Sequence, residues 1–327
     1  MKRSIAASAC LVALLGAAVP ANAAFITFVS GDGNDALACT SPATACRQIG
    51  GATGALSKTD SGGVVHVLPG EYDAFEIPQN LSVGIIAEGG LASILNGSVP
   101  IPGGGEASIL VNNTNSENVV RIRGLQIESF GAPIAVVGNE TTLHIERCVL
   151  APLPGFNGID FRGGGGLLTR LFVSDTIISK QVGPRDATGI RIRPTSSAGV
   201  TAVLDNVRIE DLGTGILIDG GATSGSITMN VKDSVISGNA ARGIGVFEAV
   251  SGGPSTVVLE RTTVSGNSAQ GIFASRALAS VRVRQSAITG NTVGVVSANG
   301  GQIISHGDNV LAGNTTNGAF TSTVAPQ

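Results

Sequence analysis

The chain has 327 residues and a formal net charge of −3, and only 13% of its residues are charged. It contains 47 glycines and no tryptophan, a composition expected when short Ile, Val and Leu segments are joined by glycine-rich turns. No basic run is present, which argues against a nucleic-acid partner. The length is sufficient for a sizeable core within one domain.

Residues 1–23 have the pattern of a signal peptide. Lys2 and Arg3 precede an apolar stretch from Ile5 to Val19, and Ala21–Ala23 reads A-x-A. We expect cleavage after this site. A membrane anchor is the alternative, but the stretch is shorter than about 18–20 residues and Pro20 ends it. The processed protein is therefore predicted to be exported, periplasmic or extracellular, without a membrane span.

Residues 24–63 are predicted to form an N-terminal loop and cap. Cys39 and Cys46 lie seven positions apart beside turn-forming residues, and in an oxidising compartment they are expected to form a small disulfide. The following segment places Ile49, Ala52 and Leu56 on one face of a short helix. Such a helix would cover the open end of a stacked structure.

Residues 64–327 contain a repeated strand phrase. Self-similarity at this period indicates stacked units, and these units are strand-rich and too short for a helix. We predict an all-β parallel solenoid of nine to ten coils, about 45 Å long at roughly 4.8 Å per coil. The repeated phrase starts at Ile122, Ile145, Val173, Leu204, Val231, Leu259 and Val283.

Alternation along each phrase predicts which side chains face outward. The fourth position should face inward, so Cys148 is expected to be a buried, structural thiol and not a reactive one. The second position should face outward and form a row whose charges mostly alternate in sign, as expected of a solvated surface. Each ion pair in such a row stabilises the fold by about 0–1 kcal/mol. That row is Arg123, Glu146, Ser174, Asp205, Lys232, Glu260 and Arg284.

A second phrase follows each repeated strand: a turn ending in Gly-Asn, then a strand beginning with Gly-Ile or Gly-Val. Asn239, Asn267, Asn291 and Asn314 close these turns. Asparagine accepts turn geometry and bonds to nearby backbone groups. On successive coils these side chains would form an amide ladder.

The segments CTSPATACRQIGGATGAL, GGVVHVLPGEY and LQIESFG, together with the repeated SGN…GI phrases, resemble exported bacterial right-handed parallel β-helix proteins. That superfamily includes pectate lyases, polygalacturonases, pectin methylesterases and alginate epimerases. The resemblance covers nearly the whole processed chain. It implies the fold, but one fold supports many functions.

The catalytic motifs of these enzymes are incomplete in this chain. His306 lies in SHGDN, which lacks the first glycine and the partner motifs of polygalacturonases. Arg193 and Pro194 begin a segment like that of pectate lyases, but the second arginine is missing. No catalytic set can therefore be transferred residue by residue.

The best candidate site lies on the outward positions of the Gly-Ile strands. Stacking should bring five residues of three consecutive coils within about 10 Å. Arginines bind carboxylates in a forked geometry. The two aspartates could share a calcium ion, although its usual shell has six to eight oxygens. An arginine or carboxylate could then act as base in a β-elimination. Alternatively, the five residues form ion pairs on a solvated face. The catalytic candidates are Asp160, Arg162, Arg191, Arg193 and Asp219.

Three functions fit these patterns. The first is an exported solenoid that binds polysaccharide or another surface polymer without catalysis and needs no cofactor. The second is a polysaccharide lyase or glycoside hydrolase acting on acidic glycans, with calcium if a lyase. The third is a structural or adhesive surface protein. We favour the first because no family catalytic set is intact; whether the protein is an enzyme and its oligomeric state stay open.

Overall fold

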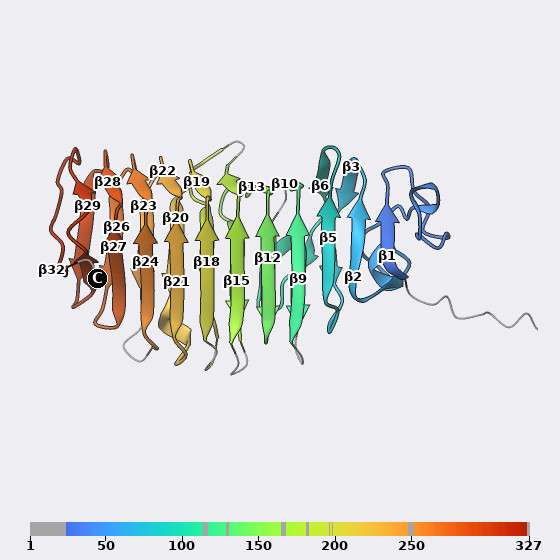
Figure 1. Cartoon of the computed structure of the whole chain (residues 1–327), viewed down its shortest axis with the longest axis horizontal. Coiled ribbons are helices and arrows are strands. Elements are labelled where there is room, and N and C mark those ends of the chain that lie inside the picture. The colour runs from blue at the N-terminus through green and yellow to red at the C-terminus, as the bar shows by residue number, and fades with distance from the viewer. Residues whose placement is uncertain are drawn as a thin grey trace, which may run out of the picture.

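The computed structural model describes residues 24–113, 117–128, 131–164, 168–180, 183–195, 197, 199–247 and 252–325. The predicted signal peptide, residues 1–23, lies outside the described residues. The chain winds into an elongated stack whose strands lie side by side along the long axis (Figure 1). In the described ranges, no helix is long and apolar enough to cross a membrane.

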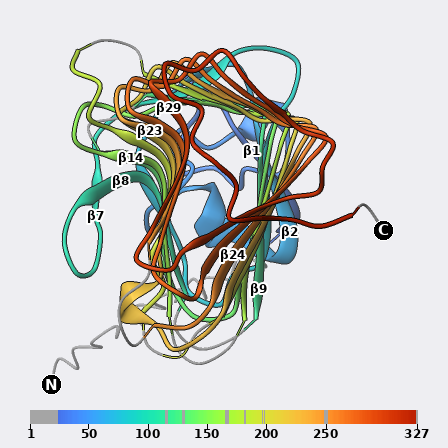
Figure 2. The same ribbon diagram turned by 90° about the vertical axis from the view of Figure 1, so that its left-hand side faces the viewer.

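Three sheets form the walls of the stack, and we name them A, B and C in the order in which the chain visits them. In the part of the chain that the structure describes, every strand pair is parallel except the pair β7–β8. Figure 2 shows these walls around a closed interior. Sheet A holds β1 (Ala24–Val29), β2 (Thr59–Val67), β5 (Val83–Ala87), β9 (Asn118–Arg123), β12 (Thr141–Glu146), β15 (Thr169–Ser174), β18 (Val200–Asp205), β21 (Ile227–Lys232), β24 (Ser255–Glu260), β27 (Ala279–Arg284), β30 (Gln302–Ser305) and β32 (Ser322–Thr323).

Sheets B and C complete each coil. Sheet B holds β3 (Gly70–Asp73), β6 (Ala92–Asn96), β10 (Leu125–Glu128), β13 (Val149–Ala151), β16 (Ile177–Ser179), β19 (Arg208–Glu210), β22 (Val235–Ser237), β25 (Thr263–Ser265), β28 (Ala287–Thr289) and β31 (Val310–Leu311). Sheet C holds β4 (Phe75–Ile77), β7 (Val99–Pro100), β8 (Glu106–Asn113), β11 (Ala132–Gly138), β14 (Asn157–Gly163), β17 (Thr188–Ile192), β20 (Thr214–Asp219), β23 (Arg242–Phe247), β26 (Gln270–Ser275) and β29 (Val293–Ala298).

The predicted all-β parallel solenoid is confirmed, with about 8 turns where nine to ten coils were expected. At both ends the chain makes partial laps. The strand β1 pairs only with β2 in sheet A, and β32 pairs only with β30. These terminal strands extend one wall without completing a coil.

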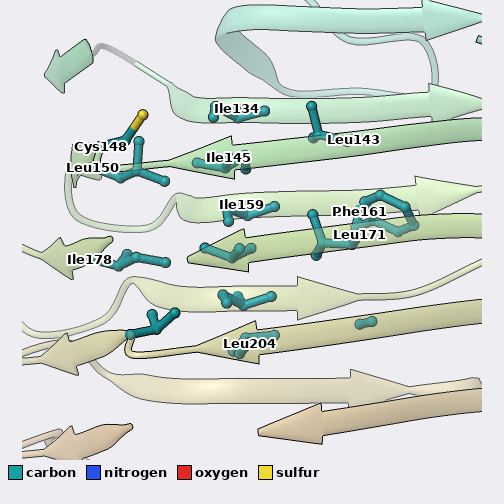
Figure 3. Close-up of a cluster of buried hydrophobic side chains, with 14 of the residues drawn as sticks. Ile134, Leu143, Ile145, Cys148, Leu150, Ile159, Phe161, Leu171, Ile178 and Leu204 are labelled. Carbon is teal, nitrogen blue, oxygen red and sulfur yellow. The ribbon is translucent and has the colours of Figure 1, made fainter. Parts of the chain in front are cut away.

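A continuous aliphatic core fills the interior. The inward side chains of all three sheets join one buried cluster, of which Ile145, Leu150 and Ile159 represent one coil. Figure 3 shows how such residues from successive coils stack along the axis. Cys148 belongs to this cluster and has no disulfide partner among the described residues. Burial raises the pKa of its thiol to about 11, which agrees with the predicted structural role.

The outward row predicted for sheet A is confirmed by the strand register. Glu146 pairs with Arg123 on one side and with Ser174 on the other. Asp205 and Lys232 are register partners, and their charged groups lie 2.8 Å apart. Glu260 then pairs with Arg284. The row is a solvated, largely self-neutralising surface.

The turn from sheet A to sheet B depends on one residue in left-handed conformation. Arg147, for example, has φ of +52° and is exposed, while the next residue, Cys148, points into the core. A residue other than glycine adopts this conformation at a cost of roughly 1–2 kcal/mol. The position recurs as Gly124, Arg147, Asp175, Asn206, Asp233, Arg261 and Gln285.

The turn from sheet B to sheet C carries the predicted amide ladder. The Nδ2 group of Asn239 donates to Oδ1 of Asn267 over 2.8 Å, and Asn267 donates in the same way to Asn291 over 2.8 Å. Asn291 donates to Asn314 over 2.9 Å. The first three side chains are buried, so the ladder supplies partners for polar groups that water cannot reach.

The N-terminal cap differs from the expected helix. The disulfide between Cys39 and Cys46 is present. In the segment predicted to be helical, residues 49–54 form bends and η2 (Ala55–Lys58), a single 3-10 turn, follows them. Two further 3-10 turns are η1 (Pro42–Thr44) and η3 (Gly220–Ala222). Ile49 and Leu56 still cover the core, whereas Ala52 is exposed. Three glycines between positions 50 and 54 make a helix costly, at about 1 kcal/mol each.

Candidate functional site

The five candidate residues lie together on the outer face of sheet C. Asp160 in β14 pairs in register with Arg191 in β17, which pairs with Leu217 in β20. One position further along each strand pair, Phe161 pairs with Ile192. The next outward column is therefore formed by Arg162, Arg193 and Asp219. The Gly-Ile pattern placed all five residues on the correct face.

Asp160 is buried beneath two arginines. Its side chain is 2% exposed, and its Oδ2 atom accepts a 2.9 Å hydrogen bond from Nε of Arg162. Nη2 of Arg162 lies 2.7 Å from the same oxygen. The other oxygen, Oδ1, lies 3.5 Å from Nε of Arg193, an ion pair without a hydrogen bond. Asp160 therefore fixes two guanidinium groups from below.

Arg191 has a separate partner on the next coil. Its Nη2 atom donates to Oδ2 of Asp219 over 3.1 Å. The backbone amide of Gly221, within η3, donates to the other carboxylate oxygen of Asp219 over 3.4 Å. Asp219 is 40% exposed, so this pair is open to solvent in a way that Asp160 is not.

A hairpin from the preceding coils covers part of the cluster. The strands β7 and β8 are antiparallel and enclose a loop at residues 101–105, which projects from the wall of sheet C (Figure 2). An added Cβ at Gly105 would lie 3.4 Å from Nη2 of Arg162, so the loop backbone rests close to this guanidinium. The loop explains why only 12% of the Arg162 side chain is exposed.

Two hollows lie beside the arginines. One, of about 330 Å³, is lined by Pro102, Val137 and Asp219, with Arg162 and Arg193 between them. The other, of about 200 Å³, also contacts Arg162 and Arg193 and extends towards Asp160 and Arg191. A ligand lying along this face would therefore meet guanidinium groups in both hollows.

Three guanidinium groups gather in the cluster. Arg162, Arg191 and Arg193 form ion pairs with two carboxylates, and a third carboxylate, Glu106, lines the smaller hollow beside them. The side chains of Arg191 and Arg193 are 29% and 32% exposed. Their Nε atoms are buried and have no hydrogen-bond partner among the described residues. An anionic ligand would find three guanidinium groups close together, two of them on partly exposed side chains.

The geometry does not suit the calcium ion considered for Asp160 and Asp219. Each carboxylate already faces an arginine, and two carboxylates supply few of the six to eight oxygens that calcium takes. Across the described ranges, no group of three or more His, Cys, Asp and Glu side chains is arranged to hold a metal. The two carboxylates serve instead as partners of the arginines.

The sequence pattern located the cluster but not its internal pairing. The ion pairs considered as an alternative to catalysis do form, yet Asp160 is buried and not solvated. Neither the covering loop at residues 101–105 nor the η3 turn beside Asp219 was linked to the site. The three consecutive glycines at 103–105 were the available signal for a close loop.

Comparisons with known proteins agree with this architecture. Residues 107–316 match the model of the right handed beta helix region, which is most of the chain. Pectate lyase Pel9A superposes with a TM-score of 0.60 at 11% identity, covering 92% of this chain and 78% of that one. The mannuronan C-5 epimerase AlgE4 A-module of Azotobacter vinelandii gives 0.38 at 13% identity, covering 81% and 91%. No curated protein matches the sequence. At these identities the structural likeness concerns the fold alone.

Proposed function

The chain belongs to the right-handed β-helix family, and we propose that it binds an acidic polysaccharide along the outer face of sheet C without catalysis. The observation that carries this proposal is the set of three guanidinium groups held around Asp160 beside the two hollows. Arg191 and Arg193 present partly exposed guanidinium groups, and a uronate carboxylate matches their forked donors.

The position of Asp160 favours binding over catalysis. A general base must come within about 2.6–3.2 Å of the proton that it removes. Asp160 is 2% exposed, and both of its oxygens face arginines. Its role is to hold Arg162 and Arg193 in place. The remaining carboxylate, Asp219, is paired with Arg191.

Export is part of the same proposal. The predicted signal peptide at residues 1–23 would take the chain to the periplasm or the cell exterior. The disulfide between Cys39 and Cys46 supports this, because such bonds persist in oxidising compartments. Extracellular or periplasmic polysaccharides would then be within reach.

The test is isothermal titration calorimetry of the processed protein with octasaccharides of galacturonate and of alginate. Binding to wild type is expected, and Arg193→Ala should lower the affinity by roughly tenfold, the loss expected for one charge-assisted contact. Arg208→Ala is the matched control, because Arg208 lies on sheet B and also pairs with a carboxylate two residues away. Its affinity should equal that of wild type.

Two outcomes would overturn the proposal. Absence of binding by wild type would favour a structural or adhesive protein. Release of unsaturated products from polygalacturonate or alginate with calcium, lost in Arg191→Ala or Arg193→Ala, would establish a lyase instead.

A further inference from the structure

The outer face of sheet C continues beyond the arginine cluster into an aromatic one. Leu217 pairs in register with Gly245, which pairs with Phe273. In the neighbouring column, Asp219 pairs with Phe247. The columns that carry Arg191 and Arg193 therefore lead directly to two phenylalanines on β23 and β26.

The two phenyl rings and one guanidinium lie against each other over a glycine. The ring centroids of Phe247 and Phe273 are 5.0 Å apart, and the rings are tilted by 35°. Cζ of Arg242 lies 5.3 Å and 5.0 Å from these centroids. An added Cβ at Gly245 would be 2.8 Å from Cε2 of Phe247, so the ring occupies the space above this glycine.

Packing over Gly245 accounts for the position of the rings, but not for the charge beside them. Arg162, Arg191 and Arg193 each face a carboxylate, whereas Arg242 has no acidic partner within the described residues. Its Nε atom and Oε1 of the neighbouring Gln270 are buried and unpaired there. The guanidinium is attracted to the ring faces, and with no carboxylate paired to it in the described ranges it is available to an anion as a further partner.

We infer that Arg242, Gly245, Phe247 and Phe273, which we call the aromatic platform, form a second binding position for the same acidic polysaccharide. The apolar face of a sugar ring would pack on the phenyl rings, and its carboxylate would pair with Arg242. This inference rests on the proposed function. It adds a specific feature: the polymer extends along the solenoid axis towards the C-terminal end.

Continuity and spacing support a polymer as the occupant. The aromatic platform begins two coils beyond β17, roughly 10 Å from Arg193 along the axis at about 4.8 Å per strand. Leu217 and Asp219 lie between the two clusters on β20. One monosaccharide cannot reach both, whereas an oligosaccharide lying across the strands can. Both clusters present guanidinium groups on the same face, which matches a repeating anion.

The experiment uses the same calorimetry with a galacturonate or alginate octasaccharide, whichever binds wild type. The Phe247→Leu/Phe273→Leu double variant keeps apolar side chains but removes the ring faces. Its affinity should fall roughly tenfold, the loss expected for two aromatic contacts. Val258→Leu is the matched control, because Val258 lies on the outer face of sheet A.

Arg242→Gln tests the charge. It should lower the affinity and also weaken its dependence on salt, since one ionic contact is lost. Thermal unfolding of each variant shows that the solenoid is intact. Combined with Arg193→Ala, the double variant should lose affinity additively, because separate positions contribute independently.

Failure of this inference can be told apart from failure of the proposed function. If wild type binds and Arg193→Ala weakens binding while the platform variants bind like wild type, only the aromatic platform is refuted. If wild type binds neither octasaccharide, both proposals fall.

Discussion

The amide ladder makes the sharpest prediction about stability. Asn267 lies in the middle of the ladder and is 1% exposed. Its Oδ1 atom accepts from the backbone amide of Asn239 over 3.1 Å and from Nδ2 of the same residue over 2.8 Å. Replacing Asn267 with alanine removes this acceptor and strands both donors where water cannot reach them.

The expected cost follows from those two donors. Each buried donor without a partner costs about 1–3 kcal/mol, so Asn267→Ala should lower the free energy of unfolding by roughly 2–6 kcal/mol. Asn314→Ala should cost less, because Asn314 is only partly buried and ends the ladder. Asn230→Ala is the matched control, since this asparagine is exposed on sheet A.

Urea unfolding followed by far-ultraviolet circular dichroism measures these differences. We expect the order of stability to be Asn230→Ala, then Asn314→Ala, then Asn267→Ala. If Asn267→Ala is within about 0.5 kcal/mol of Asn230→Ala, the typical range of a surface substitution, the ladder does not stabilise the coil and the reasoning is wrong.

Three further predictions concern single positions. The Cys148 thiol has a pKa near 9.0 in the unfolded chain, and burial raises its native pKa to about 11. The free energy of unfolding of wild type should therefore fall as pH rises from 9 to 11, and Cys148→Ala should lack that loss in urea titrations. Equal dependence on pH in the two proteins would contradict this prediction. Arg147 has φ of +52°, a conformation that glycine adopts without strain. Arg147→Gly should therefore raise the melting temperature slightly, whereas Arg147→Val should lower it. The reverse order would contradict the left-handed conformation at this turn. Gly243→Ala should cost about 1–3 kcal/mol in urea unfolding, because its Cβ would lie 2.6 Å from Cγ1 of Val264; unchanged stability would refute the close packing.

Much of the fold follows from the sequence because strand alternation and coil stacking are local rules. The charged row through Glu146 and Asp205 needed only the period of two and the repeat alignment. The ladder through Asn267 needed only that the same turn recurs on each coil. A solenoid repeats its contacts, so one correct alignment fixes many of them.

Features that the residue type at a position does not signal were not predictable in the same way. Arg147 and Gln285 adopt left-handed backbone although neither residue type signals it; the neighbouring coils impose the turn. The apolar spacing of Ile49 and Leu56 predicted a helix, yet the intervening glycines favoured bends and both side chains reached the core without one.

In the candidate site, too, the sequence pattern predicts some features and not others. Alternation placed Asp160, Arg191 and Asp219 on one face, but which arginine covers which carboxylate depends on side-chain conformation and on the loop at residues 101–105. The aromatic platform was also missed as a unit. Arg242 and Phe247 are five positions apart and meet only because Gly245 leaves room between them.

The measurement that tests the central claim most directly compares one acidic octasaccharide with its carboxyl-reduced, neutral counterpart on the wild-type protein. The two ligands share ring shape and length, so any difference in affinity reports the carboxylates alone. Recognition by the guanidinium groups on sheet C predicts that the acidic form binds and that the reduced form binds at least about tenfold more weakly. Equal affinities for the two forms would contradict the account.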